Sequence, residues 1–425
     1  MLRDSIKILF VFLIILILAG YNFIGCGGCP EGHHQYNGEC VQDSNNNIDG
    51  DYEIPEYQVD DLVLPSEVLE KNNIDFDASG LYSGETYTFD VPEGVTSMII
   101  WAMGNEDDFI LPLTIHSPSN ELIYDLNVDV DNGYIGDNYD FQYYFDFNTS
   151  LFLPNTPKVD FESGEWKIDL GSLYANNKIF IRTFFSYETH EEEKEPLLNV
   201  NIWPVGIDVA NSDGELKEEF QESLQVFKDL YTTAGITIGD VEIQNLTEDE
   251  IKQYGVINSL DEFYEMFLIT EKVQNDYPNI FLINGFDADG LEGVLGISSH
   301  IPGPPGVKGT KHSGVAVSMQ YYENYPRITG YTMAHELGHW LGLFHTSEAT
   351  GRFFDPLDDT KECSHLNDSN GDRYVDPLEC SNLDASNVMF WMVPFEDDFL
   401  IGDDGQNFSM DQEWVLHRNP IMNFQ

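Results

Sequence analysis

The stretch that decides the fold is HELGHWLGLFH, residues 335–345 of the 425-residue chain. His335 and His339 are four residues apart, so on a helix they lie on one face and can share a metal ion. Gly342 can adopt a positive φ, so it can end the helix and turn the chain until His345 becomes a third ligand. Three neutral imidazoles leave a fourth position open for water, which is typical of a catalytic zinc site.

Glu336 directly follows the first of these histidines. Its carboxylate can reach a zinc-activated water without being a ligand of the metal itself. We therefore expect Glu336 to act as the general base of a hydrolytic reaction, which takes a proton from water and passes it to the leaving group.

The spacing of these residues resembles that of the metzincin zinc proteases. Metzincins also carry a methionine turn beneath the metal, and Met389 follows the third histidine at a suitable distance. Within the metzincins, the chain looks most like the pappalysin and cytophagalysin group. This likeness extends over residues 197–425 and is carried by residues 341–346, by Asp358-Asp359-Thr360 followed by Cys363, and by residues 409–412. The resemblance implies cleavage of internal peptide bonds in proteins.

One residue near the methionine departs from that family pattern. Several metzincin groups have a tyrosine two residues after the methionine, where it binds zinc or stabilises the oxyanion. This chain has Trp391 there, and an indole can donate one hydrogen bond but cannot ligate a metal. We therefore expect no tyrosine switch at this position.

The overall composition narrows the class of protein. The chain carries 75 acidic and 19 basic residues, a formal net charge of −56. This balance argues against nucleic-acid binding, which needs clustered Lys and Arg. It fits a solvated protein in a salty or calcium-containing external medium. The hydrophobic fraction of 42% is large enough for packed cores, and the length allows two to three domains.

The N-terminus indicates export. Arg3 and Lys7 precede an apolar run, residues 8–19, so we expect residues 1–25 to be a signal peptide. The run is shorter than the ~20 residues that span a bilayer, which disfavours the alternative of an uncleaved anchor. Phe23-Ile24-Gly25-Cys26 resembles a bacterial lipobox, which implies lipid on Cys26. We therefore expect a membrane-anchored lipoprotein at the periplasmic face or the cell surface, with an extracellular protein as the alternative.

The remaining cysteines form two local pairs. We expect disulfides between Cys29 and Cys40 and between Cys363 and Cys380, because an exported protein meets an oxidising environment.

The chain divides into segments of different composition. Residues 26–61 are polar and turn-rich, and we expect a lipid-anchored tether. Residues 62–196 are rich in Ile, Phe, Val and Thr, with strands expected at 97–101, 166–170 and 178–187 and no amphipathic helix. This pattern predicts an all-β sandwich domain.

Residues 197–425 change to an α/β pattern, which predicts a metzincin-like zincin catalytic domain. Ser212 and Glu215 form a candidate capping box for a helix whose apolar face is followed by Gly235 as its stop. A second helix, which carries the histidines, begins near Arg327. Strands are expected at 198–203, 236–243, 279–284 and 314–319. We expect the last of these to be an edge strand that pairs with an extended substrate.

An acidic loop between Cys363 and Cys380 suggests a calcium site. Oxygen-bearing side chains occupy positions one, three, five, seven, nine and twelve of an EF-hand-like loop: Asp368, Asn370, Asp372, Tyr374, Asp376 and Glu379. Arg373 stands at position six, where glycine is usual, and the alternative is a solvated acidic turn.

Three functions remain open from the sequence. The first is a zinc-dependent endopeptidase with a protein or peptide substrate and a membrane anchor. The second is a binding or adhesion lipoprotein whose β-sandwich recognises a partner. The third is a zinc hydrolase that acts on something other than peptides. We favour the endopeptidase, because a binding module does not need Glu336.

Overall fold

The computed structural model describes residues 33–36, 39–42, 85–103, 110–125, 148–172, 180–187, 195–288, 290–291, 293–393, 395–396, 399–400 and 406–424. The chain divides into two compact units, Met1–Glu56 and Tyr57–Gln425. In the first unit, β1 (His33–Tyr36) and β2 (Glu39–Gln42) pair as an antiparallel hairpin.

The predicted signal peptide, Cys26 and Cys29 lie outside the described residues, as does nearly all of the predicted tether. Cys40 lies in strand β2. The export, lipidation and first disulfide therefore stay predictions. Within the described part of the chain, no helix combines the length and apolarity needed to cross a bilayer.

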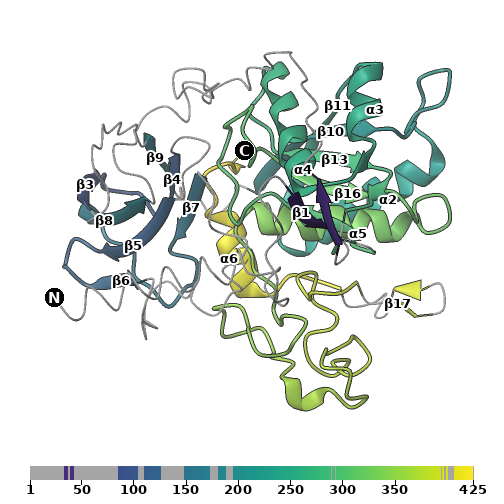
Figure 1. Ribbon diagram of the computed structural model, residues 1–425. Coiled ribbons are helices and arrows are strands. Elements are labelled where there is room, and N and C mark those ends of the chain that lie inside the picture. Colours follow the sequence, from purple (N-terminus) through teal and green to yellow (C-terminus); the bar gives the residue numbers. More distant parts are fainter. Residues whose placement is uncertain are drawn as a thin grey trace. The chain divides into compact units, whose positions relative to one another are not determined.

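The described residues between 85 and 187 form strands and turns but no helix, in two antiparallel sheets (Figure 1). The strand order of the four-stranded sheet is β3 (Glu85–Val91), β8 (Gly164–Ser172), β5 (Ile110–His116) and β6 (Leu122–Asp125). The order of the three-stranded sheet is β7 (Asn148–Leu153), β4 (Ser97–Met103) and β9 (Phe180–Ser186).

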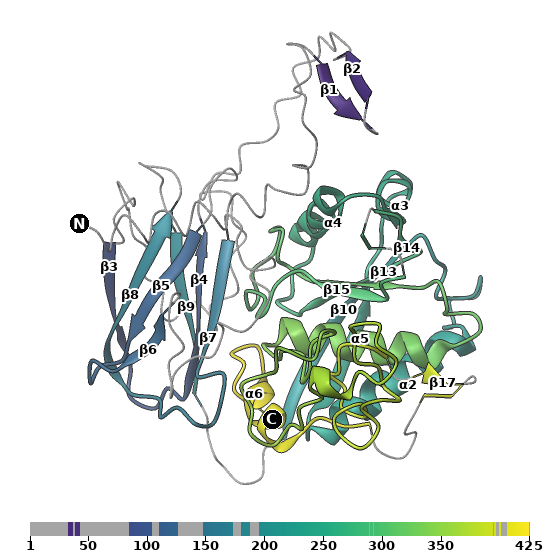
Figure 2. The same ribbon diagram turned by 60° about the horizontal axis from the view of Figure 1, so that its bottom comes forward.

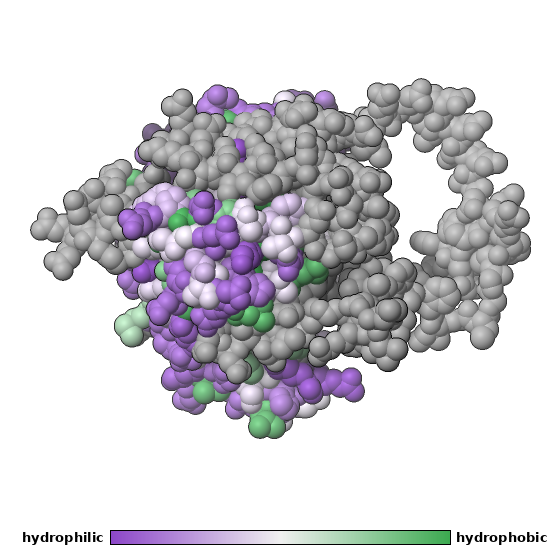
Figure 3. Space-filling view, turned by 90° about the vertical axis from the view of Figure 1, so that its left-hand side faces the viewer, coloured by the Kyte–Doolittle hydropathy of each residue, from purple (hydrophilic) through white to green (hydrophobic). Residues whose placement is uncertain are grey.

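The four-stranded sheet has one buried and one exposed face. Along β3, Tyr87 and Phe89 are buried while Thr86, Thr88 and Asp90 are exposed, the period-two alternation of a half-buried strand. Figure 3 looks onto this side of the molecule, where hydrophilic residues predominate among the coloured atoms.

The central strand of the three-stranded sheet is buried on both faces. All seven residues of β4 are buried. Its even-numbered members, such as Ile100, join the core between the two sheets. Its odd-numbered members, such as Trp101, join the core of the α/β part of the chain. The second face explains why this strand reads as an apolar run without alternation.

A six-stranded sheet forms the centre of the α/β part. Its order is β11 (Thr237–Ile243), β10 (Pro196–Val205), β13 (Asn279–Ile283), β16 (Val315–Ser318) and β15 (Gly296–Ser298), with β19 (Asn423–Phe424) paired to β10. Strands β10, β11, β13 and β16 are parallel, whereas β15 and β19 are antiparallel to their neighbours.

The prediction that residues 314–319 form an edge strand is wrong. Strand β16 lies between β13 and β15, and β15 stands at that end of the sheet. The sequence of β15 is only Gly296-Ile297-Ser298, which is too short for a recognisable strand pattern.

Helices cover both faces of this sheet (Figure 2). The long helices α2 (Glu218–Thr233) and α5 (Pro326–Trp340) share one core with alternate residues of β10, such as Val200. The opposite core contains Trp203 and the shorter helices α3 (Glu248–Tyr254), α4 (Leu260–Met266) and η5 (Phe267–Lys272).

The remaining elements are short. They are β12 (Val256–Ile257), which pairs with β14 (Gly285–Phe286), the hairpin of β17 (Phe395–Glu396) and β18 (Phe399–Leu400), the turn η6 (His365–Asn367), and α6 (Met410–His417).

The start of α2 differs from the prediction. The helix begins at Glu218 with Lys217 as its N-cap and no side-chain cap, so the proposed capping box of Ser212 and Glu215 is wrong. These two residues lie in a turn closed by a hydrogen bond from the Asn211 amide to the Glu215 carbonyl, 2.7 Å. The expected stop is confirmed, because Gly235 adopts φ +66° directly after the helix.

Candidate metal centre

Helix α5 places two histidines on one face. Pro326 occupies its first turn. Backbone N–H groups in the first turn have no partner within the helix, so proline costs no hydrogen bond there. His335 and His339 follow at one-turn spacing, both buried, and their Nε2 atoms lie 3.2 Å apart. The helical spacing predicted from the sequence is confirmed.

The chain reverses directly after α5. Gly342 adopts φ +112°, which glycine reaches without steric cost. Its amide donates to the His339 carbonyl at 2.8 Å, and the Leu343 amide donates to the Gly338 carbonyl at 2.9 Å. This pair of hydrogen bonds is the Schellman arrangement of a helix C-terminus. It returns the chain to the helix, so that the Nε2 of His345 lies 3.0 Å from that of His339.

A backbone carbonyl fixes the ring orientation of each helical histidine. The Nδ1 of His335 lies 2.7 Å from the Val388 carbonyl oxygen, and the Nδ1 of His339 lies 2.7 Å from the Leu343 carbonyl oxygen. A carbonyl can only accept, so both Nδ1 atoms carry the proton and both Nε2 atoms present lone pairs.

A carboxylate fixes the third histidine. The Nδ1 of His345 lies 2.9 Å from Oε1 of Glu348. Burial by itself would raise the pKa of Glu348, but the neighbouring His345 and the hydrogen bond to it outweigh burial and lower the pKa. Glu348 is therefore an ionised acceptor for the His345 ring.

The three imidazoles fit a tetrahedral metal ion. Their Nε2 atoms are separated by 3.0–3.2 Å, and ligands at ~2.0–2.1 Å in tetrahedral geometry are about 3.3 Å apart. Burial, with the neighbouring His345, lowers the pKa of His335 to about 3 and lowers that of His339 well below its usual range. Lone pairs that face one another without protons repel, and a cation among them removes that repulsion.

Glu336 is held between α5 and the edge strand. Its side chain is 6% exposed, and burial raises the pKa of its carboxyl to about 8 against a hydrogen bond from the Ser298 backbone that lowers it. Gly296 leaves room for it, because a Cβ on that residue would stand 2.7 Å from Glu336 Oε1. The predicted general base thus sits beside the histidines and against strand β15.

Met389 lies beneath the metal-binding helix. It is fully buried, and a Cβ on Gly338 would stand 2.7 Å from its sulfur. The Met389 carbonyl accepts from the Thr346 amide at 3.0 Å, one residue after the third histidine. The Met389 amide donates to Asn387 Oδ1 at 2.8 Å. This position agrees with the predicted methionine turn, whose role stays a prediction.

The segment of residues 409–412, one of those on which the family resemblance depends, contacts both the methionine turn and the segment of residues 358–360. Gln412, in the first turn of α6, exchanges hydrogen bonds with Asn387 at 2.8 and 3.2 Å. Asp359 accepts from the Ser409 hydroxyl at 2.7 Å and from the Asp411 amide at 2.9 Å. Segments far apart in sequence are therefore joined next to the turn.

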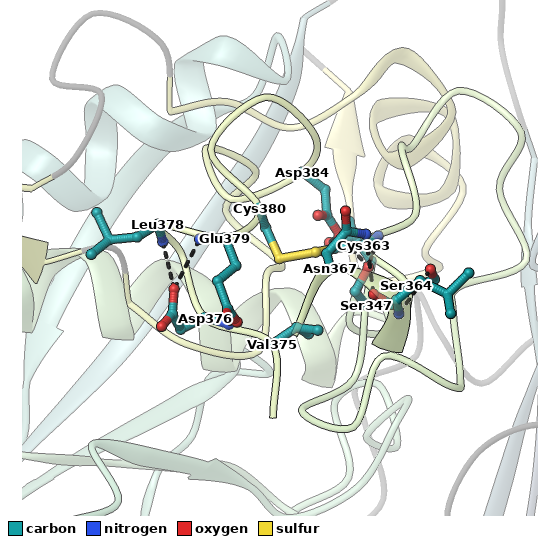
Figure 4. Close-up of a disulfide and its surroundings, with 12 residues drawn as sticks. Ser347, Cys363, Ser364, Asn367, Val375, Asp376, Leu378, Glu379, Cys380 and Asp384 are labelled. Atoms are coloured by element: carbon teal, nitrogen blue, oxygen red, sulfur yellow. Dashed lines mark hydrogen bonds between the residues drawn. A yellow bond between two sulfur atoms is a disulfide. The ribbon is translucent and has the colours of Figure 1, made fainter. Parts of the chain in front are cut away.

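The predicted disulfide between Cys363 and Cys380 is confirmed. Figure 4 shows Ser347 and Asp384 beside it. The Cys363 amide donates to the Ser347 hydroxyl at 2.8 Å, and that hydroxyl donates to Asp384 Oδ2 at 2.5 Å. The segment closed by the disulfide is thus hydrogen-bonded to the loop that carries His345.

Trp391 belongs to this region rather than to the metal centre. Its indole N–H donates to the Val375 carbonyl at 2.7 Å, and its ring packs against the core around the disulfide. The tryptophan fixes the acidic loop to the segment after Met389.

The six predicted calcium ligands belong to the loop 368–379, but among the described residues no three of its carboxylates converge as a group that could hold a metal ion. Several of their oxygens accept backbone amides, for example Asp372 Oδ1 from the Tyr374 amide at 2.8 Å and Glu379 Oε1 from the Ser369 amide at 2.6 Å. Arg373 adopts φ +80°, the left-handed conformation that glycine favours at this position of an EF-hand loop. The calcium site stays a prediction.

Two functional contacts could not be found from the sequence. Glu348 lies three residues beyond the last histidine, where no ligand spacing points to it. Gly296 and Ser298 lie 40 and 38 positions before Glu336 in the printed sequence, and only the sheet order brings them to it. A strand of three residues gives no signal that could have revealed this contact.

Comparisons with known proteins give distant likenesses. No family model matches the sequence, and no curated protein matches it. Metalloproteinase-II from Bacteroides fragilis is 16% identical with a TM-score of 0.26, and the match covers 41% of this chain and 55% of that chain, about half its length. Archaemetzincin from Methanopyrus kandleri is 16% identical with a TM-score of 0.29, over 52% of this chain and 94% of that chain.

A third match is to xylanase 10C from Cellvibrio japonicus, at 9% identity and a TM-score of 0.17, over 39% of this chain and 33% of that chain. None of these TM-scores is high enough to carry an argument about this chain. The metal centre itself is the place in the described chain where three histidines converge, His335, His339 and His345.

Proposed function

We propose that this protein is a zinc-dependent endopeptidase that hydrolyses internal peptide bonds of proteins. The observation that carries the proposal is the convergence of three imidazole Nε2 atoms within 3.0–3.2 Å of one another, with the buried carboxyl of Glu336 beside them. His335, His339 and His345 hold the metal.

A zinc ion in this site supplies Lewis acidity, which acidifies water and polarises a carbonyl group. Glu336 accepts the proton of the attacking water at its carboxylate and then donates it to the nitrogen of the leaving amine. A carboxylate can make both transfers, because it gains a proton from the water and then loses it to the leaving amine. Burial of Glu336, His335 and His339 keeps bulk water away from these groups.

Strand β15 supports the choice of an extended polypeptide as substrate. It is antiparallel to β16 and stands at the end of the sheet order. Its residues Gly296 and Ser298 contact Glu336. A peptide that added itself to this edge by main-chain hydrogen bonds would pass the general base, whatever its side chains.

The experiment is a digest of a peptide library by the zinc-loaded wild type and by Glu336→Gln. Glutamine keeps the size of the side chain but cannot accept the proton, so we expect kcat to fall by about 10²–10⁴-fold at unchanged zinc content. Glu323→Gln, at an exposed residue before α5, is the matched control and should keep full activity. If the wild type binds zinc and is as inert as Glu336→Gln, the protein is not a peptidase.

We also propose that the protein is exported and lipid-anchored through Cys26. The disulfide between Cys363 and Cys380 supports export, since such bonds persist in oxidising compartments. Labelling of cells with a fatty-acid analogue tests the anchor: the wild type should incorporate the label, and Cys26→Ser should not.

A further inference from the structure

The three histidines of the metal centre differ in the group that holds their second ring nitrogen. Backbone carbonyls hold His335 and His339. His345 alone is held by a side chain, the Glu348 carboxylate, at 2.9 Å. A carbonyl is neutral and belongs to the fold, whereas a carboxylate carries a full charge and can be replaced without altering the backbone.

We propose that Glu348 is a positioning residue for the metal: it fixes the ring orientation of His345 and strengthens it as a ligand. The inference rests on the proposed zinc site. Glu348 accepts a hydrogen bond from the Nδ1–H group of His345. This hydrogen bond turns the Nε2 lone pair of His345 towards His335 and His339. The negative charge of Glu348 also increases the basicity of the imidazole, which raises its affinity for a cation.

His345 needs such a partner more than the helical histidines do. His335 and His339 stand on consecutive turns of α5, both less than 9% exposed, so the helix already limits their orientation. His345 lies beyond the Gly342 turn, and 22% of its side chain is exposed, as is 28% of Glu348. A partly exposed ring on a loop can rotate about its χ angles, and a directional hydrogen bond restrains that rotation.

The backbone around Glu348 is fixed well enough for this role. The Glu348 amide donates to the Phe353 carbonyl at 3.0 Å, and the Glu348 carbonyl accepts from the Gly351 amide at 2.7 Å. Between the two residues of the pair, the hydroxyls of Thr346 and Ser347 both donate to Asp384 Oδ2, at 2.8 and 2.5 Å.

The restraint continues to the disulfide shown in Figure 4, because the Cys363 amide donates to the Ser347 hydroxyl. The loop that carries His345 and Glu348 is therefore hydrogen-bonded to a segment that a disulfide cross-links.

The test compares zinc affinity in wild type, Glu348→Gln and Glu348→Ala by competition with a chromophoric chelator. Glutamine keeps an acceptor oxygen but loses the charge, and alanine loses both. We expect Glu348→Ala to weaken zinc binding by about 10–100-fold, with Glu348→Gln between it and the wild type. Glu323→Gln, an exposed matched substitution outside the site, should bind zinc like the wild type.

Thermal unfolding of the metal-free proteins separates positioning from a structural role. The metal-free variants should unfold at the wild-type midpoint, since the hydrogen bond matters chiefly when the ring is a ligand. Unchanged zinc affinity in both variants overturns the inference. So does a lowered metal-free midpoint in Glu348→Ala together with wild-type affinity in Glu348→Gln. If Glu348→Ala does not fold, the affinity of Glu348→Gln decides: a loss supports positioning, and no loss overturns it.

The outcomes are distinct from a failure of the proposed function. A wild type that does not bind one zinc at the histidines removes the proposed function and the inference together. A wild type that binds zinc and cleaves peptides, with Glu348 variants of unchanged affinity, removes the inference alone.

Discussion

Asp355 is a buried acid outside the proposed chemistry. It is 9% exposed, and its Oδ1 accepts from the Thr360 hydroxyl at 2.5 Å and from the Leu357 amide at 3.3 Å. Burial raises the pKa of Asp355 well above its usual range, and the nearby Asp359 and Asp384 raise it further, although the two hydrogen bonds oppose this.

This shift predicts a pH dependence of stability. A raised folded-state pKa means that the stabilisation is complete below the unfolded pKa of about 3.9 and is lost as pH rises through the folded pKa. Within that window the wild type should lose up to about 1.4 kcal/mol of unfolding free energy per pH unit from this group. Asp355→Asn should lack this loss, so its stability relative to the wild type should increase as pH rises above the unfolded pKa of about 3.9 towards the raised folded pKa.

The measurement is urea unfolding in the presence of a chelator, with Asp213→Asn as an exposed control. A difference between Asp355→Asn and wild type that does not change with pH contradicts the assignment.

The residues of the metal centre were predictable where a local rule exists. The three histidines, Glu336 and the Gly342 turn follow from helical periodicity and from the conformational freedom of glycine. Glu348 follows no such rule, because its contact with His345 depends on how a loop is folded back. The contact of Gly296 with Glu336 depends on strand order, which side-chain pattern does not encode.

The loop 368–379 lies within the segment that the disulfide between Cys363 and Cys380 closes, and we propose that it binds calcium. Asp372→Asn still offers a side-chain oxygen to accept from the Tyr374 amide but removes one negative charge. We expect Ca²⁺ to raise the thermal midpoint of the zinc-loaded wild type, and to do so at higher concentrations in Asp372→Asn. Scanning calorimetry over a calcium series measures both. A wild-type midpoint that does not respond to calcium indicates a solvated acidic turn.

Helices α2 and α5 touch where Gly330 faces Ser223. A Cβ on Gly330 would stand 2.2 Å from the Ser223 carbonyl oxygen, and the Ser223 hydroxyl donates to the Pro326 carbonyl at 2.8 Å. Only glycine permits this backbone approach. Gly330→Ala should therefore lower the unfolding free energy by about 1–3 kcal/mol.

Because the same helix carries two of the histidines, Gly330→Ala should also weaken zinc binding. Urea unfolding of the metal-free protein and chelator competition measure the two effects. Gln225→Ala, on the exposed side of α2, should change neither. Wild-type stability in Gly330→Ala would contradict the tight helix contact.

The elements themselves were predicted unevenly. The apolar face predicted for helix α2 had five residues: Phe220, Leu224, Phe227 and Tyr231 are buried in α2, whereas Leu216 precedes the helix and is only partly buried. Its first turn was misplaced because Ser212 and Glu215 have capping-box spacing in a segment that closes a turn instead. The spacing of two side chains does not reveal that the Glu215 amide donates to Asp213 Oδ1 instead, at 3.2 Å.

At the scale of the whole molecule, one core joins the three-stranded sheet to the α/β part. Its members from the sheet are Ile99, Trp101, Met103, Phe152 and Phe184. Phe152 reaches the metal-binding turn, because a Cβ on Gly342 would stand 2.6 Å from its ring. The Ser97 hydroxyl donates to the Arg418 carbonyl at 2.5 Å, and Lys158 pairs with Asp358 at 2.6 Å.

This shared core predicts that the sheet supports the metal centre. Phe152→Ala removes a ring that is 1% exposed, so the unfolding free energy should fall by about 3–5 kcal/mol. The Gly342 turn loses its packing partner, so zinc affinity should fall as well. Phe185→Ala, on β9 and only partly buried against the other core, is the matched control. It should destabilise less and bind zinc normally, and equal zinc affinity in both variants would contradict the coupling.

The sequence predicted strands in residues 62–196 and an α/β pattern in residues 197–425, but it did not predict the core that the two parts share. The apolar run of β4 is consistent with burial on both faces, yet composition does not say which surface covers the second face. Long-range packing depends on the assembled shapes of two sheets and two helices, and no window of sequence contains that information.

Burial of β4 on both faces bears on how such a protein could evolve. An accessory module that is attached through a flexible linker can be lost, gained or exchanged by recombination without harm to its neighbour. Here strand β4 packs against the α/β part with one face and is also the central strand of its own sheet. A recombination break near residue 195 would therefore expose two complementary apolar surfaces. The two halves should therefore be inherited as a unit, and a lineage that dropped the sheets would have to replace the surface of α5 and its turn with polar residues at the same time.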